Sequence, residues 1–295
     1  MAELLTTDEA AAHLRMSERK LYELVAAGAV PCSKATGRWL FPKEALDRWV
    51  MAGLIAGQQF VLAAPPAIVG GSHDPLLDWA LREADTGLAV AFGGSLDGLR
   101  RLGKGEVMLA GTHLADPEAP LGEAWNVTHV RRQLAGQPVV VLEWARRRQG
   151  LIVAPDNPLG LGSARDLKRR RVMGRQREAG AFVLLERLLE GADLNVSDIR
   201  MHEAPARTEA DVAAAVAEGR ADAGLGIEAV ARQYRLGFVP LVTERYDLVI
   251  GRRAAFGEPV QRLLAFGRTG GFSAHAAALG GYDVSRLGTV HYNGP

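Results

Sequence analysis

The 295-residue chain contains a single cysteine, Cys32, which excludes an internal disulfide and a zinc site built from several cysteines. Its formal net charge at pH 7 is only +1, which excludes a uniformly basic surface that binds nucleic acid without selectivity. No apolar run reaches the roughly 20 residues that cross a bilayer. The N-terminus "MAELLTTDEA" carries acids where a secretory signal has basic residues. We therefore expect a globular cytoplasmic protein, long enough for two or three domains.

Residues 1–52 have the pattern of a small helical DNA-binding domain. The stretch "TTDEAAAHLRM" predicts a short helix with Thr7 as its N-cap. The stretch "SERKLYELVAAG" predicts a second helix that Ser17 caps and Gly28 ends. Two short helices joined by a tight turn predict a helix-turn-helix, whose second helix enters the major groove of DNA.

A small hairpin is predicted next, with strands at 29–32 and 38–41, followed by a helix that begins at Pro42. With this hairpin the block resembles the excisionase and MerR-like winged helix-turn-helix family, whose motif is matched almost throughout by "LTTDEAAAHLRMSERKLYELVAAGAVPCSKATGRWLF". The resemblance implies DNA contacts from the second helix and the wing, by Ser17, Arg19, Lys20, Tyr22, Lys34, Arg38 and Trp39.

Aromatic residues of this block have an alternative role as its small core. We prefer the core for Phe41 and Trp49 and leave both roles open for Tyr22 and Trp39. Acidic and basic side chains are equally numerous in residues 1–50, so a single copy is expected to bind DNA weakly. We therefore expect a homodimer or higher homo-oligomer that binds paired half-sites.

Residues 53–66 lose charge and end on a Pro-Pro pair. This segment is either a linker or an apolar helix used for dimerisation, and the sequence leaves both open.

Residues 67–295 alternate short apolar segments with amphipathic ones, which predicts an α/β domain of parallel sheets with helices on both faces. Gly-Gly-Ser occurs twice where a predicted strand meets a helix, at Ser72 and Ser95. Ligands of open α/β sheets bind at the carboxyl ends of strands, and helix N-termini bind anions. We therefore expect these turns to line one crevice with "AGTHL" at 110–114 and "GRQREAGAF" at 174–182.

The layout resembles the periplasmic-binding-protein fold (type II), in which two lobes close over a small ligand. More narrowly, it is similar to the molybdate- and tungstate-binding type found behind helix-turn-helix modules and after molybdopterin-biosynthesis domains. Four motifs carry the likeness: "GSHDPLLDWAL", "GSLDGLRRLGKGEVMLAGTHL", "VAAAVAEGRADAGLGI" and "FVPLVTERYDLVI". A further motif of that family is altered in this chain. Gly174 stands where the family has Asn, and Ala181 and Phe182 stand where it has Thr and Arg.

The resemblance implies an oxyanion, molybdate or tungstate, held by hydroxyl groups and backbone N–H groups. The expected ligand site comprises Ser72, His73, Asp74, Ser95, Thr112, His113, Arg175, Gln176, Ala179 and Gly180. Because a carboxylate repels a dianion, we expect Asp74 to point away and to cap the helix or hold His73. The alternatives are an ordinary helix cap at Ser72 or Asp74 and structural roles for His73 and His113. The histidine spacing matches no metal-ligand motif, so neither a metal nor a cofactor is expected.

We expect a one-component transcription regulator, in which ligand-driven closure of the lobes changes the spacing of two DNA-binding modules. Its expected partners are operator DNA and a small effector, with no membrane contact. The alternatives are a sensor of an organic ligand, such as a molybdopterin-related pterin, and an accessory protein of molybdenum-cofactor biosynthesis. No catalytic residues are expected, because no nucleophile and base stand out. Glu143, Glu178 and His202 are assigned to the surface or a hinge.

Overall fold

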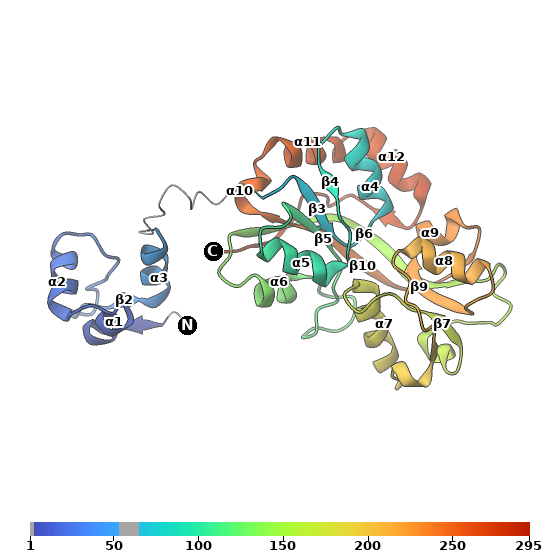
Figure 1. The fold of residues 1–295 in the computed structure, drawn as a ribbon, viewed down its shortest axis with the longest axis horizontal. Coiled ribbons are helices and arrows are strands. Elements are labelled where there is room, and N and C mark those ends of the chain that lie inside the picture. Colours follow the sequence, from blue (N-terminus) through green and yellow to red (C-terminus); the bar gives the residue numbers. More distant parts are fainter. Residues whose placement is uncertain (1–2, 53–64) are drawn as a thin grey trace. The chain divides into compact units, whose positions relative to one another are not determined.

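The computed structural model describes residues 3–52 and 65–295, which belong to two compact units, Met1–Ala64 and Pro65–Pro295 (Figure 1). Of the predicted linker or dimerisation segment, residues 53–64 lie outside the described part of the chain. None of the helices in the described ranges combines the length and apolar character that a bilayer crossing requires.

Within residues 3–52, the N-terminal unit has three helices and one short strand pair. Its helices are α1 (Thr7–His13), α2 (Glu18–Ala26) and α3 (Lys43–Ala52), and its strands are β1 (Leu4–Leu5) and β2 (Phe41–Pro42). The two strands pair antiparallel. Leu21, Phe41 and Leu46 are fully buried at the centre of this unit, and Trp39 and Trp49 pack partly buried against them. The core role preferred for Phe41 is therefore confirmed, and Trp49 also packs on the core.

The helix ends follow the predicted pattern with one shift. The N-cap of α1 is Thr6 rather than Thr7, because the backbone N–H of Thr6 donates to the Glu9 carboxylate at 2.8 Å and completes a capping box one residue earlier. The hydroxyl of Ser17 accepts from the backbone N–H of Lys20 at 3.3 Å, as expected for the cap of α2. Gly28 follows α2 with a φ of +63°, the left-handed conformation that ends helices.

The predicted hairpin is smaller than expected. The strand predicted at 29–32 is wrong, and the one predicted at 38–41 is reduced to Leu40, which forms a single antiparallel bridge with Ser33, and Phe41, the first residue of β2. Pro31 has no N–H group and cannot extend the ladder past this bridge. The returning segment continues as β2, which pairs with β1 instead, and the third helix begins at Lys43 rather than at Pro42.

The C-terminal unit is built on one ten-stranded sheet, with the order β4-β3-β5-β10-β6-β9-β7-β8 and with β11 and β12 paired to β6. Its strands are β3 (Ile68–Gly71), β4 (Ala89–Val90), β5 (Leu109–Thr112), β6 (Val139–Val153), β7 (Arg171–Met173), β8 (Arg200–Met201), β9 (Ala223–Ile227), β10 (Gly237–Gly251), β11 (Tyr282–Asp283) and β12 (Val290–Asn293). Its helices are α4 (Pro75–Glu83), α5 (Ser95–Gly103), α6 (Val127–Gln133), α7 (Gly180–Glu190), α8 (Glu209–Ala217), α9 (Glu228–Gln233), α10 (Arg252–Ala255), α11 (Glu258–Gly267) and α12 (Gly270–Leu279).

Two strands of 15 residues each, β6 and β10, run antiparallel to one another and pass through both halves of this unit. At one end they are flanked by β5, β3 and β4. We call these strands, together with helices α4–α6 and α10–α12, the first lobe. At the other end they continue into β9, β7 and β8, which we call the second lobe with α7–α9. Parallel pairing was predicted throughout, and this is wrong for the long strands. The chain enters the second lobe on β6 and returns on β10, so the two must run in opposite directions.

Each lobe has its own apolar core. In the first lobe, Leu76 on α4, Trp144 on β6 and Phe272 on α12 are fully buried in one cluster. In the second lobe, Leu184 on α7 and Leu225 on β9 belong to another cluster. Because β6 and β10 run through both lobes, the polar residues at the middle of these two strands lie at the junction of the lobes.

Candidate ligand site and DNA-facing surface

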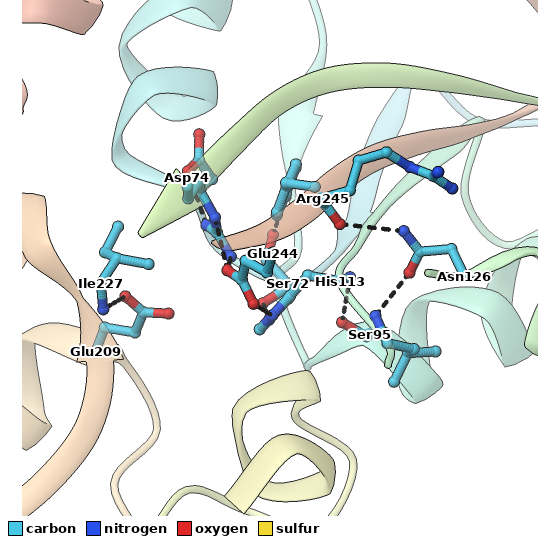
Figure 2. A network of polar contacts seen from close by, with 12 residues as sticks. Ser72, Asp74, Ser95, His113, Asn126, Glu209, Ile227, Glu244 and Arg245 are labelled. Atoms are coloured by element: carbon cyan, nitrogen blue, oxygen red, sulfur yellow. Dashed lines mark hydrogen bonds and ion pairs between the residues drawn. The ribbon is translucent and has the colours of Figure 1, made fainter. Parts of the chain in front are cut away.

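A chain of hydrogen bonds joins three buried residues at the lobe junction: Ser72, His113 and Glu244 (Figure 2). Ser72 follows β3, His113 follows β5, and Glu244 lies in the middle of β10. The hydroxyl of Ser72 lies 3.0 Å from Nε2 of His113, and Nδ1 of His113 lies 2.8 Å from Oε2 of Glu244. Each of these residues is at most 1% exposed. The expectation that the turn at Ser72 and the segment 110–114 lie together is therefore confirmed for Ser72 and His113.

A buried arginine connects this chain to the start of α4. Arg147 stands opposite Glu244 in the pairing of β6 with β10, and its Nε donates to Oε1 of Glu244 at 2.9 Å. Its Nη1 donates to Oδ2 of Asp74 at 2.8 Å. The other carboxylate oxygen of Asp74 accepts from the backbone N–H of Leu77 at 2.7 Å, and the Tyr282 hydroxyl donates to Asp74 at 2.6 Å. Asp74 caps the helix as expected, and its second partner is Arg147 rather than His73.

These charges hold one another ionised despite burial. Burial by itself would raise the pKa of Glu244, but Arg147 and His113 outweigh it and hold that pKa below its ordinary value. Burial would likewise lower the pKa of Arg147, but the carboxylates of Glu244 and Asp74 raise it well above its ordinary range. The Tyr246 hydroxyl, buried beside them, has a pKa raised well above its usual value by burial and by Asp74. Glu244 is therefore a carboxylate at neutral pH.

The second lobe contacts the first at this place through the loop before α7. The backbone N–H of Leu96 donates to the carbonyl of Glu178 at 3.0 Å, and the Gln176 amide donates to the carbonyl of Gly93 at 3.4 Å. The first residue of α7, Gly180, packs directly on His113, because a Cβ at Gly180 would stand 2.8 Å from Nε2. The start of α7 thus faces the Ser72 and His113 pair.

The remaining residues expected at the ligand site lie around this centre. The Ser95 hydroxyl, at the start of α5, accepts from the backbone N–H of His113 at 3.3 Å. Arg175 is 6% exposed and its guanidinium donates to the carbonyl of Arg207 at 2.8 Å. Burial lowers the pKa of Arg175, and the carboxylates of Glu209 and Asp211 partly offset this.

Three expected site residues take no part in the hydrogen-bonded network. His73 is half-buried and packs edge-on against Phe92, with ring centroids 5.3 Å apart. Thr112 is fully buried, and its hydroxyl has no hydrogen-bond partner among the residues that the structure describes. Ala179 is buried just before α7. The structure therefore brings Ser72, Ser95 and His113 together and leaves His73 and Thr112 outside their network.

In the N-terminal unit, the expected DNA contacts lie mostly on the surface. The side chains of Ser17, Arg19, Lys20, Tyr22, Lys34 and Arg38 are exposed, and Trp39 is half-buried with Lys34 Nζ 5.1 Å from its ring centre. Arg19 and Lys20 both approach the Glu23 carboxylate, at 3.4 and 3.2 Å. Because such exposed pairs are weak, both cations remain available to phosphate.

Family models match both units of the chain. A model described as a helix-turn-helix domain matches residues 4–53, and one described as a PBP superfamily domain matches residues 79–268, more than half of the chain. The chain belongs to the PBP superfamily. The predicted fold class, a helix-turn-helix domain followed by a two-lobed α/β domain of the periplasmic-binding-protein kind, is confirmed. We call residues 65–295 the PBP domain.

Proteins from two bacteria are similar to this chain in sequence. The YvgK protein of Bacillus subtilis (strain 168), which is uncharacterized, is 26% identical over 303 residues that cover 97% of this chain and 96% of that protein. An uncharacterized protein from the 5′ region of a ferredoxin 2Fe-2S gene in Clostridium pasteurianum is 35% identical over 80 residues, covering 27% of this chain and 71% of that protein.

Among solved structures, the PBP domain is similar to an ABC-transporter substrate-binding protein from Clostridium perfringens that was crystallised with bound phosphate. The TM-score is 0.53 at 10% identity, covering 75% of this chain and 98% of that one. At this identity the likeness shows the fold alone.

The PBP domain contains site residues that the sequence analysis missed, above all Arg147 and Glu244. Charged side chains in the middle of two long, otherwise apolar segments, "VVVLEWARRRQGLIV" and "FVPLVTERYDLVI", are the signal that could have found them. Glu143 was assigned to the surface or a hinge; it lies on β6 and is 1% exposed, so the surface assignment is wrong. Its carboxylate accepts from Arg146 at 3.1 Å and lies 2.6 Å from Nε2 of His291.

The second lobe of the PBP domain contributes one further buried carboxylate. Glu209, the first residue of α8, accepts from the backbone N–H of Ile227 at 3.3 Å, and its other oxygen has no hydrogen-bond partner in the described ranges (Figure 2). Across residues 3–52 and 65–295, no group of three or more His, Cys, Asp or Glu side chains is placed to hold a metal ion.

Proposed function

We propose that this protein is a DNA-binding transcription regulator whose PBP domain binds a tetrahedral oxyanion, with molybdate and tungstate as the first candidates. The observation that carries the proposal is the union, in one chain, of a helix-turn-helix domain and a two-lobed domain whose lobes meet at buried hydroxyl groups. The first part of this union indicates a DNA partner and the second a small-molecule ligand.

The chemistry of the lobe junction favours an anion held by neutral donors. Ser72 and Ser95 lie on the first lobe, and the start of α7 at Gly180 faces them from the second lobe. The first N–H groups of a helix have no acceptor within it and carry the positive end of its dipole. Hydroxyl and N–H groups in a water-poor site replace the hydration of an oxyanion without a counter-charge.

Closure of the two lobes would link ligand to DNA. A ligand shifts an equilibrium between open and closed lobes only when it binds one of them more tightly, and a ligand touching both lobes does so. In the proposed regulator, closure changes the DNA affinity of two helix-turn-helix domains in a homodimer. An organic ligand such as a pterin is the second candidate, because Ala181 and Phe182 stand where the family it resembles has Thr and Arg.

The proposal includes no catalysis. Ser72, His113 and Glu244 are hydrogen-bonded in the order serine, histidine, carboxylate, as in the catalytic triad of a hydrolase. This favours a hydrolase as a second candidate function. In the proposed regulator these three hydrogen-bonded residues orient the Ser72 hydroxyl for ligand binding. Ester hydrolysis by the purified protein that disappears in Ser72→Ala would contradict the non-catalytic part of the proposal.

The ligand is tested by thermal unfolding of the full chain with molybdate, tungstate, sulfate, phosphate and buffer alone. A ligand at a hundredfold its dissociation constant stabilises the folded state by about 2.7 kcal/mol, so a true ligand raises the unfolding temperature of the PBP domain. A rise with molybdate or tungstate supports the oxyanion. No rise with any of the four overturns it and leaves the organic ligand.

The site is tested by the double variant Ser72→Ala, Ser95→Ala. It is expected to lose the ligand response in thermal unfolding and in DNA binding, while DNA affinity without ligand stays unchanged. The matched control is Ser273→Ala, Ser285→Ala, which changes two exposed serines of the same domain. A normal ligand response in the first variant would exclude this junction as the site.

A further inference from the structure

The ionised carboxylate of Glu244 fixes where the hydrogens lie in the hydrogen bonds that join Ser72, His113 and Glu244. Glu244 is ionised and accepts two bonds from Arg147, so its oxygen near His113 is also an acceptor. Nδ1 of His113 must therefore carry the proton. In a neutral imidazole only one nitrogen is protonated, which makes Nε2 an acceptor. Across the 3.0 Å contact, the hydroxyl proton of Ser72 then points at His113.

This arrangement gives Ser72 the wrong polarity for an oxyanion. With its only proton committed to His113, the Ser72 oxygen presents only lone pairs to a ligand. The oxygens of molybdate, tungstate or sulfate also present only lone pairs. A neutral His113 therefore opposes the binding of the ligand class proposed above.

A second proton on His113 reverses the polarity. In the imidazolium both nitrogens donate, so Nε2–H donates to the Ser72 oxygen and frees the hydroxyl proton to donate to a ligand. We propose that His113 determines the ligand specificity of Ser72, and that the site takes up an oxyanion together with one proton on His113. This inference rests on the proposed oxyanion function.

The charges around His113 support the same coupling. Arg147 is shared by two carboxylates, Asp74 and Glu244, so these three side chains carry one net negative charge. All three are buried, and water screens their field only weakly. A proton on His113 cancels this charge before a dianion arrives, whereas a neutral His113 leaves it facing the ligand.

The other groups packed around His113 do not cancel this charge. On β10, the Tyr246 ring stacks on the His113 ring, with ring centroids 6.0 Å apart. Burial raises the pKa of Tyr246, so its hydroxyl stays neutral. On β6, the Gln149 amide, oriented by its hydrogen bonds, donates to Glu244 at 2.7 Å. At the start of α5, Ser95 is neutral. From the second lobe, the first turn of α7 contacts His113 at Gly180. In the same lobe, Arg175 interacts with two carboxylates, Glu209 and Asp211, so these groups add no net positive charge.

Calorimetric titration of the full chain with molybdate or tungstate tests the inference. Titrations at one pH in two non-anionic buffers with different ionisation enthalpies give the number of protons taken up. At a pH at which His113 is neutral in the free protein, we expect uptake of about one proton per oxyanion. In that pH range the association constant should fall about tenfold for each unit of pH increase. Binding with no proton uptake and no pH dependence would overturn this inference while the oxyanion function stands. Absence of oxyanion binding would overturn both.

The variant His113→Gln separates protonation from shape. Glutamine places an amide nitrogen near the position of Nε2, and this nitrogen donates to Ser72 at any pH. The variant is expected to bind oxyanion without proton uptake. The control His129→Gln changes a half-buried histidine on α6 that contacts the Ala115 carbonyl, and it should keep the uptake of one proton. Proton uptake that persists in His113→Gln would assign the proton elsewhere. If His113→Gln does not fold, the wild-type proton count decides.

Discussion

Gly180 lies so close to His113 that a Cβ on Gly180 would stand 2.8 Å from both Nε2 and the backbone oxygen of His113. The two residues come from opposite lobes of the PBP domain, and Gly180 is the first residue of α7. A backbone oxygen cannot rotate away as a flexible side chain can. Glycine at position 180 is therefore what lets the lobes meet in this arrangement.

The variant Gly180→Ala should keep the lobes from closing fully. Overpacking of this kind costs about 1–3 kcal/mol, so ligand affinity in calorimetry is expected to fall about 5- to 150-fold. The control is Gly270→Ala, since Gly270 is the first residue of α12 and a Cβ there meets nothing within 4 Å. Equal affinities for Gly180→Ala and wild type would show that ligand binds without this contact.

The variant Glu244→Gln should destabilise the PBP domain at neutral pH. It removes a buried carboxylate from Arg147, and breaking such a pair costs about 3–5 kcal/mol. The folded-state pKa of Glu244 is lowered, so its stabilisation is complete above the unfolded pKa of about 4.3 and is lost as the pH falls through the folded value. Urea unfolding should therefore show a difference from wild type that is full at pH 7 and shrinks at acid pH.

The control for this pH dependence is Glu190→Gln, at the exposed end of α7. It should leave the unfolding free energy within about 0.5 kcal/mol of wild type at pH 7. A constant difference between Glu244→Gln and wild type down to strongly acid pH would contradict a lowered pKa at Glu244.

The variant Tyr282→Phe should destabilise the first lobe through Asp74. The hydroxyl of Tyr282 donates to the Asp74 carboxylate at 2.6 Å, and a hydrogen bond to a charged group contributes about 1.5–3 kcal/mol. Denaturant unfolding measures the loss, with Tyr234→Phe, at a partly exposed tyrosine, as the control. Equal stability of the two variants would mean that the hydrogen bond from Tyr282 adds nothing to those that Asp74 accepts from Arg147 and Leu77.

The variant Arg38→Ala should weaken DNA binding uniformly across sequences. Arg38 is exposed beside the short bridge of Ser33 and Leu40, where a phosphate contact is expected. Losing one phosphate contact reduces the slope of log affinity against log salt by about 1. The control Lys43→Ala removes a cation at the start of α3, whose Nζ lies 3.8 Å from the Glu3 carboxylate. Full DNA affinity and an unchanged salt slope in Arg38→Ala would exclude a phosphate contact by this wing residue.

Sequence patterns predicted the elements of this protein better than their pairing. The cap at Ser17 and the stop at Gly28 depend on backbone geometry within a few residues, so the local sequence predicts them. The hairpin strands failed because pairing depends on a distant partner: Phe41 joins Leu5 at the start of the chain. The antiparallel course of the long strands failed for the same reason, since apolar periodicity carries no strand direction.

By itself the sequence determined the two-domain organisation, the superfamily and the two Gly-Ser turns at Ser72 and Ser95, because motifs and periodicity are local records of burial and turn geometry. Only the tertiary structure decided that Ser72 meets His113, and that His113 meets Glu244, 131 residues further along the chain. It also decided that Arg147 is shared by two carboxylates. Buried charges tolerate low dielectric only when partners surround them, and those partners come from strands that only folding brings together.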